Sequence, residues 1–149
     1  MPSAFPSEKW DNRFLELARV VSSWSKDPST KVGAVIADNK HIVSVGFNGF
    51  PAHVEDREEW LANRETKLQL ITHAEINAIL NAARPVRGCT VYLYPIFPCP
   101  DCAKHLGAAG ISRVVTRMGS DVTSKYLNTL ETTKTVLQTM GIRFDVYHY

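Results

Sequence analysis

The sequence lacks a strong charge bias. Its 149 residues contain 17 Lys and Arg against 15 Asp and Glu, which gives a net charge of +2. Proteins that bind nucleic acids through charge carry a concentrated basic face, and charge-driven membrane binding needs a similar excess. In this chain the basic residues are scattered and nearly balanced, so the composition argues against a polynucleotide or a membrane as the partner.

Long apolar runs and cysteines are also scarce. No window approaches the roughly 20 apolar residues of a membrane span, and the segment Met1–Ser7 is polar without the apolar core of a signal peptide. A cytoplasmic location is the resulting expectation. The three cysteines are an odd number, which excludes a fully paired disulfide framework. Cys99 and Cys102 form a Cys-x-x-Cys pair, which indicates metal or redox chemistry in a reducing compartment.

No repeat, low-complexity tract or linker divides the chain, so we expect one domain over residues 1–149. Apolar spacing predicts helices and strands that alternate after an opening hairpin, which favours an α/β fold with a mixed sheet and helices on both faces. The dense charges of residues 53–67 predict a solvated loop with one or two helical turns. An insertion of this length can also cover an active site. The expected helices are 7–25, 73–83, 100–109 and 122–140, and the expected strands are 31–37, 41–47, 89–94, 113–117 and 142–147.

The strongest signal is the tripeptide His-Ala-Glu at 73–75, followed across a helix and a strand by Pro-Cys-Pro-Asp-Cys at 98–102. Together they match the H-x-E…P-C-x-x-C signature of zinc-dependent deaminases. Cys99 and Cys102 lie on one face of a helix start, where free N–H groups favour thiolates. With His73 they offer zinc three ligands and leave the fourth tetrahedral position to water. Glu75 is placed to move protons between that water and a substrate.

The cysteine pair is compatible with two other kinds of site. A lone Cys-x-x-Cys also occurs in thiol redox sites and in structural zinc sites. Structural zinc normally takes four protein ligands, but the chain has no second Cys-x-x-Cys, and a redox pair would not account for the His-Ala-Glu tripeptide. A catalytic zinc is therefore the favoured interpretation. Cys89 begins an apolar strand and is expected to be a buried core residue.

Residues 10–149 resemble the cytidine and deoxycytidylate deaminase superfamily. Three segments resemble deoxycytidylate deaminases in particular: 25–34 (SKDPSTKVGA), 45–51 (VGFNGFP) and 73–79 (HAEINAI). The resemblance implies a three-layer α/β/α sandwich around a five-stranded mixed sheet. It also implies zinc-dependent deamination of dCMP to dUMP and ammonia, which supplies thymidylate synthesis.

The resemblance also implies which residues bind the substrate. Asn48 would contact the sugar, the turn of Ser29, Thr30 and Lys31 would lie near the phosphate, and Ala74 would lend its backbone to the edge of the base. Hydroxyls and an ammonium in a turn can hold an anion. The same residues also suit an ordinary helix-to-strand loop, and that alternative stays open here.

Further implications concern the rim of the site, the metal count and the assembly. Family members usually place an aromatic or basic residue near the nucleotide after the fourth strand, for which Arg117 and Tyr126 are candidates. Some members hold a second zinc and respond to dCTP and dTTP. Val43 and Ile71 stand in regions where those members place the extra ligands, so we expect one zinc per chain and leave regulation open. Family members commonly assemble as homohexamers.

Two classes of alternative remain at this point. The chain could deaminate another base or nucleotide of the superfamily, such as dCTP, cytidine, guanine or adenosine in tRNA. It could also be a catalytically silent nucleotide-binding regulatory module, since a fold does not establish a function. The zinc ligands and Glu75 are all present, which favours the enzyme.

Overall fold

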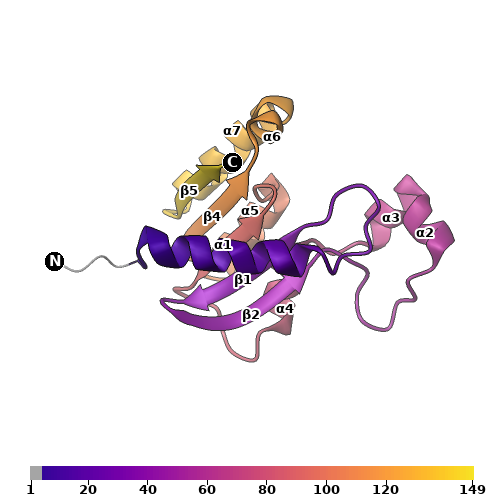
Figure 1. Cartoon of the computed structure of the whole chain (residues 1–149), viewed down its shortest axis with the longest axis horizontal. Coiled ribbons are helices and arrows are strands. Elements are labelled where there is room, and N and C mark those ends of the chain that lie inside the picture. The colour runs from indigo at the N-terminus through magenta and orange to yellow at the C-terminus, as the bar shows by residue number, and fades with distance from the viewer. Residues whose placement is uncertain (1–4) are drawn as a thin grey trace.

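The computed structural model describes residues 5–149, so the first four residues of the segment Met1–Ser7 lie outside the described residues. A central sheet contains five strands in the order β2 (His41–Phe47), β1 (Gly33–Asp38), β3 (Thr90–Tyr94), β4 (Arg113–Met118) and β5 (Arg143–His148) (Figure 1). β1 pairs antiparallel with both β2 and β3, whereas β3, β4 and β5 are parallel. The mixed sheet predicted from the sequence is confirmed. Asn39, in the left-handed region at φ 54°, turns the β1–β2 hairpin.

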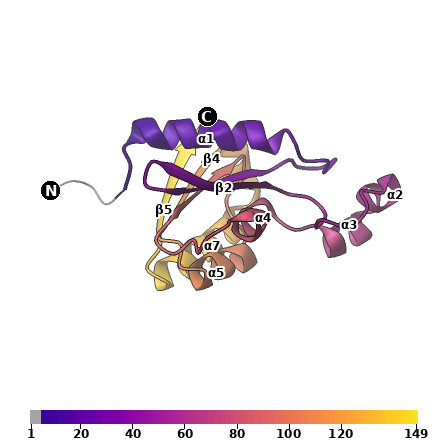
Figure 2. The same ribbon diagram turned by 90° about the horizontal axis from the view of Figure 1, so that it is seen from below.

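Helices cover both faces of the sheet, which confirms the three layers (Figure 2). On one face lies α1 (Glu8–Ser22), whose Phe14, Leu15 and Ala18 pack on alternate side chains of the central strands. On the other face lie α4 (Ala74–Asn81), α5 (Pro100–Ala108) and α7 (Leu127–Thr139), around a second core. None of the helices within residues 5–149 has the length and apolarity to cross a membrane.

Two segments differ from the sequence-based expectation. The predicted helix 122–140 is two helices, α6 (Ser120–Lys125) and α7, because Tyr126 leaves helical geometry at φ −115° and ψ 31°. The charged stretch 53–67 forms more helix than expected, namely α2 (Glu58–Ala62) and α3 (Arg64–Leu70). These two short helices pack on each other and project from the body of the molecule (Figures 1 and 2). Apolar periodicity revealed neither difference: the start of α3 is set by the Asn63 side chain, which accepts from the Thr66 N–H, and the break at Tyr126 lies within one continuous helical pattern.

Two glycines let helices approach the sheet closely. A Cβ at Gly33 would lie 2.0 Å from the carbonyl oxygen of Ala18 in α1. A Cβ at Gly46 would lie 2.4 Å from the backbone nitrogen of Ala78 in α4. No side chain fits at these distances, so glycine is required where α1 and α4 cross the hairpin. The crossing at Gly46 sets the position of α4, which carries the first half of the candidate site.

Candidate metal centre and substrate cavity

The three predicted metal ligands meet where two helices begin side by side. His73 is the N-cap residue of α4, and Cys99 is the N-cap residue of α5. Cys102 follows in the first turn of α5, after Pro100, which occupies a position where the missing N–H costs little. The parallel crossover from β3 through α5 to β4 brings both helix starts to one edge of the sheet.

The distances between the ligand atoms fit a zinc ion. His73 Nδ1 lies 3.1 Å from Cys102 Sγ and 3.7 Å from Cys99 Sγ. All three ligand atoms lie within 4.8 Å of one another. Zn–S and Zn–N bonds of standard length in a tetrahedral site separate their S and N atoms by about 3.6 Å. The donor set of one imidazole and two thiols is also one that zinc prefers. His73, Cys99 and Cys102 therefore form a possible zinc site.

Local electrostatics prepare Cys99 as a thiolate. Hydrogen bonds from the Cys102 thiol and from His73 lower the pKa of Cys99, although burial acts in the opposite direction. The backbone N–H of Cys102 also donates to Cys99 Sγ at 3.4 Å. The hydrogen bond to Cys99 and burial raise the pKa of Cys102. A divalent cation offsets the repulsion between two neighbouring thiolates, so the pair is suited to binding a metal.

Glu75 is a buried carboxyl beside this centre. It lies in the first turn of α4, its residue is 4% exposed, and it lines the same cavity as His73 and Cys99. Burial raises the pKa of Glu75, because a desolvated carboxylate is disfavoured. A carboxyl with a raised pKa exchanges protons more readily near neutral pH, which is the property of a general acid and base.

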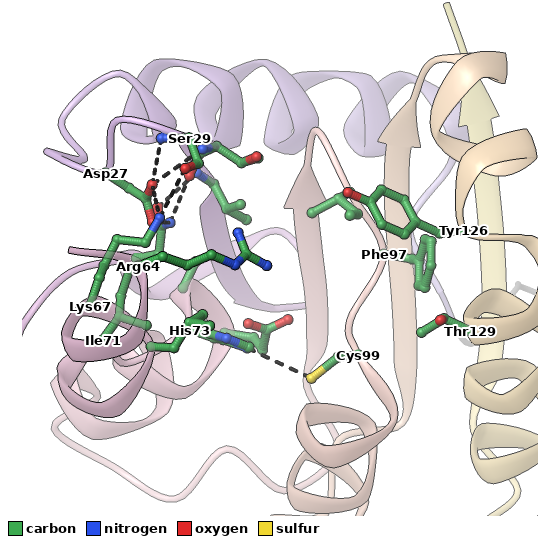
Figure 3. A pocket seen from close by; sticks show the side chains of 17 residues that line it. Asp27, Ser29, Arg64, Lys67, Ile71, His73, Phe97, Cys99, Tyr126 and Thr129 are labelled. Atoms are coloured by element: carbon green, nitrogen blue, oxygen red, sulfur yellow. Dashed lines mark hydrogen bonds and ion pairs between the residues drawn. The ribbon is translucent and has the colours of Figure 1, made fainter. Parts of the chain in front are cut away.

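A cavity of about 410 Å³ opens in front of these groups. Its volume lies within the range of small-molecule sites, roughly 300 to 1,000 Å³. Figure 3 shows side chains that enter it from three sides of the molecule. Besides His73, Ala74, Glu75 and Cys99, the cavity is lined by Asp27, Ser29, Thr30, Val32, Asn48, Arg64, Lys67, Leu68, Ile71, Ile96, Phe97, Tyr126 and Thr129.

A buried ion pair holds the loop at one end of the cavity. Lys67 Nζ donates to Asp27 Oδ1 and to Ser29 Oγ, both at 3.0 Å, and the Lys67 and Asp27 side chains are 5% and 7% exposed. Asp27 Oδ1 also accepts from the backbone N–H of Ser29 at 2.7 Å and of Thr30 at 3.3 Å. The loop is therefore fixed by a charge partner that comes from α3, far away in the sequence.

Asn48 secures the same loop from the other side. Its Nδ2 donates to the carbonyl oxygen of Thr30 at 2.8 Å and to Asp27 Oδ2 at 3.3 Å. Its Oδ1 accepts from the backbone N–H of Val32 at 2.8 Å. The side chain is 6% exposed and lines the cavity, so it shapes the wall while its amide is engaged with the protein.

The structure brings together most, though not all, of the substrate-binding residues expected from the sequence. Ser29, Thr30, Asn48, Ala74 and Tyr126 line the cavity. The lining side chains do not include Lys31, whose ammonium donates to the carbonyl oxygen of Ser25. They also do not include Arg117, whose guanidinium donates to Asn12 Oδ1 on the α1 side of the sheet. Local hydrogen bonds thus hold these two cations elsewhere. Cys89 is fully buried in the core, as the sequence predicts.

Sequence reasoning missed several lining residues. Asp27, Arg64 and Lys67 contribute charge to the cavity, and Phe97 contributes an apolar wall. Arg64 and Lys67 lie in the charged stretch that the sequence assigns to solvent. Their three-residue spacing places them on neighbouring positions of one helix face, but a solvated helix shows the same spacing. Only the partner Asp27 distinguishes Lys67 from a surface lysine.

Comparison with known proteins identifies relatives of this chain. The family model for the cytidine and deoxycytidylate deaminase zinc-binding region matches residues 8–118. An uncharacterized deaminase in the luxG 3' region of Aliivibrio fischeri is 51% identical over 106 residues, which cover 71% of each chain. Deoxycytidylate deaminase from Mus musculus is 35% identical over 145 residues, which cover 91% of this chain and 78% of the mouse protein.

A solved structure shares the fold. The dCMP deaminase from the cyanophage S-TIM5, in complex with dCMP and dUMP, superposes with a TM-score of 0.74. The match covers 95% of this chain and 98% of the phage chain at 24% sequence identity. At that identity the likeness establishes the arrangement of sheet and helices.

Proposed function

The chain belongs to the cytidine and deoxycytidylate deaminase family, and we propose that it converts dCMP to dUMP and ammonia for thymidylate supply. One observation carries the proposal: a buried carboxyl, Glu75, shares a nucleotide-sized cavity with His73 and Cys99, two of the three residues that cluster as zinc ligands. The deoxycytidylate deaminases among the relatives support dCMP as the substrate. We further propose that the whole chain acts as a single deaminase domain.

Hydrolytic deamination adds water at C4 of the cytosine ring and releases the exocyclic amino group as ammonia. When bound, zinc acts as a Lewis acid that makes water a nucleophile near neutral pH. Glu75 takes one proton of the attacking water and delivers it to N3 of the ring. It then takes the proton of the new C4 hydroxyl and passes it to the amino group, which leaves as ammonia while the C4 carbonyl forms. Its burial supports this role, because the raised pKa lets one carboxyl both accept and release a proton.

The remaining cavity walls account for binding the nucleotide. The backbone of Ala74, at the start of α4, is available to the edge of the base. Asn48 lines the wall, where family resemblance supports a contact with the sugar, and Ser29 and Thr30 lie in the loop that Asp27 orders. Tyr126 closes the far side from the break between α6 and α7 (Figure 3). A free nucleotide is thus the partner that suits the cavity.

Assembly and location extend the proposal. Family resemblance supports a homo-oligomer, with a hexamer as the specific expectation. The zinc centre needs Cys99 and Cys102 as thiolates, which supports a reducing compartment such as the cytoplasm. Size-exclusion chromatography with light scattering tests the assembly. A monomeric mass at micromolar concentration would contradict it.

Ammonia release tests the reaction. The purified protein, with its zinc content measured, is assayed with dCMP, dCTP, CMP, deoxycytidine and guanine in parallel. We expect dCMP to be preferred over deoxycytidine. Activity on another substrate alone would keep the zinc chemistry but overturn the choice of dCMP, and zinc-loaded protein without activity on any of them would favour a silent module.

Replacement of the proposed proton carrier tests the mechanism. Glu75→Gln should retain zinc but lose turnover by at least about 100-fold, since general acid–base catalysis contributes roughly that much or more. Glu65→Gln is a matched control, because Glu65 is exposed in α3 and does not line the cavity. Near-normal turnover by zinc-loaded Glu75→Gln would refute the assigned role.

A further inference from the structure

Arg64 is an exposed arginine that enters the cavity from the projecting segment. It lies in the first turn of α3 and lines the cavity together with His73 and Glu75. In Figure 3 its guanidinium points across the cavity, between the Asp27–Ser29 loop and the metal centre. Within residues 5–149 no side chain or carbonyl accepts a hydrogen bond from this guanidinium, and no carboxylate forms an ion pair with it.

The neighbouring cations all have partners. Lys67 is neutralised by Asp27 and bonded to Ser29, and Lys31 donates to a backbone carbonyl. Arg57, on the same projecting segment, pairs with Glu55 at 2.5 Å and stacks on the Trp60 ring at 4.4 Å. Apart from the ligand His73, Arg64 is therefore the cavity-lining cation whose charge is left uncompensated among the described residues.

The position of Arg64 is not explained by the stability of its helix. A cation in the first turn faces the positive end of the helix dipole, which is unfavourable. Asn63, which caps the helix by accepting from the Thr66 N–H at 3.0 Å, already provides the local stabilisation. The Arg64 guanidinium points into the cavity, and a cation in this position is suited to binding an anionic ligand.

We propose that Arg64 binds the 5′-phosphate of the substrate and is the residue that selects the nucleotide over the free nucleoside. This inference rests on the proposed function. The planar guanidinium offers two parallel N–H donors, a geometry that matches phosphate oxygens. Lys67 contributes indirectly: it neutralises the Asp27 carboxylate, which would otherwise repel the phosphate from the same end of the cavity. Arg64, from a segment distant in sequence, takes the role that the resemblance gives to Lys31.

Selectivity kinetics test the proposal. We compare kcat/KM for dCMP and for deoxycytidine in the zinc-loaded wild type, Arg64→Ala and Arg64→Lys. Arg64→Ala should lower kcat/KM for dCMP by about 10- to 100-fold, the loss expected for a charge-assisted hydrogen bond, and mainly through KM. Its effect on deoxycytidine should be much smaller, so the preference for dCMP collapses. Arg64→Lys should retain part of the preference, because an ammonium is a cation without the two-pronged geometry.

The matched control is Arg57→Ala, which removes the same charge from the same segment outside the cavity. It should leave the ratio of the two kcat/KM values unchanged. Arg64→Ala with the wild-type ratio would overturn the inference while leaving dCMP as the substrate. If the wild type does not turn over dCMP, the proposed function fails, and calorimetric binding of dUMP and deoxyuridine then decides the role of Arg64. Tighter binding of dUMP that is lost in Arg64→Ala supports the role, and equal binding in both proteins overturns it.

Discussion

Replacing Gly46 with alanine should displace α4 and weaken the zinc centre at a distance. The new Cβ would lie 2.4 Å from the Ala78 nitrogen and 2.6 Å from the Ala74 oxygen, both of them backbone atoms of the helix. Restoring ordinary contact, at 3.4 Å or more, requires α4 to withdraw by about 1.0 Å. Overpacking of this kind costs about 1 to 3 kcal/mol. His73 caps α4, and coordination tolerates errors of only about 0.2 Å, so zinc affinity should fall together with stability.

Thermal unfolding of the zinc-loaded protein and competition with a chromophoric chelator measure the two effects. For a chain of this size, 1 to 3 kcal/mol corresponds to a decrease in Tm of about 2 to 12 °C. Gly49→Ala is the matched control, because the nearest atom to its Cβ would be Phe47 Cε2 at 3.9 Å and its φ is not positive. The free energy of unfolding of Gly49→Ala should stay within about 1 kcal/mol of that of the wild type. Gly46→Ala with unchanged Tm and zinc affinity would refute the view that the β2–α4 spacing positions the metal ligands.

Two further predictions concern the zinc ligands and the buried charges under α1. Cys99→Ala should lose zinc and lower Tm by roughly 5 to 10 °C, because metal binding is coupled to folding, whereas Cys89→Ala should keep its zinc in the same metal analysis. A metal-loaded Cys99→Ala protein would show that the ligand is wrongly assigned. Burial raises the pKa of Asp11, but hydrogen bonds from Arg113 and Tyr147 lower it by more, so the folded pKa lies below the ordinary value. The ionised Asp11 therefore stabilises the fold at neutral pH, and this stabilisation is lost as the pH falls below about 4. In urea unfolding at neutral pH, the free energy of unfolding of Asp11→Asn should be lower than that of the wild type by about 3 kcal/mol or more. Below about pH 4 this difference should shrink. A difference that stays constant with pH would contradict this account.

The clustering of the three expected metal ligands could be predicted because the information for it is local. His73 and Glu75 stand two residues apart at a helix start, and Cys99 and Cys102 stand three apart at another. Short spacings of this kind fix geometry once the helices form, and the alternation of strands and helices fixes which edge they share. The same local information predicted the hairpin and the sheet type.

The end of the cavity around Asp27 could not be predicted in the same way, because its contacts join distant segments. Lys31 lies in a turn that suits an anion, but its ammonium donates a hydrogen bond to the nearby carbonyl oxygen of Ser25. Lys67 stands in a stretch with the composition of a solvated surface, yet it is buried against Asp27, 40 residues earlier. Tyr126 lies in a pattern typical of one continuous helix, and the break that exposes it to the cavity has no turn residue to mark it.

The different roles of Lys67 and Arg64 follow from how the projecting helices α2 and α3 are attached to the body of the molecule. α2 buries no residue, and the single buried residue of α3 is Lys67 itself. The segment is thus held to the body at this point largely by a polar contact, the pair of Lys67 with Asp27. Arg64 lies three residues earlier, on a neighbouring position of the same helix face, so this ion pair also fixes where the free guanidinium stands. A lysine whose charge is neutralised serves as the anchor, and the unneutralised arginine beside it remains available to a ligand.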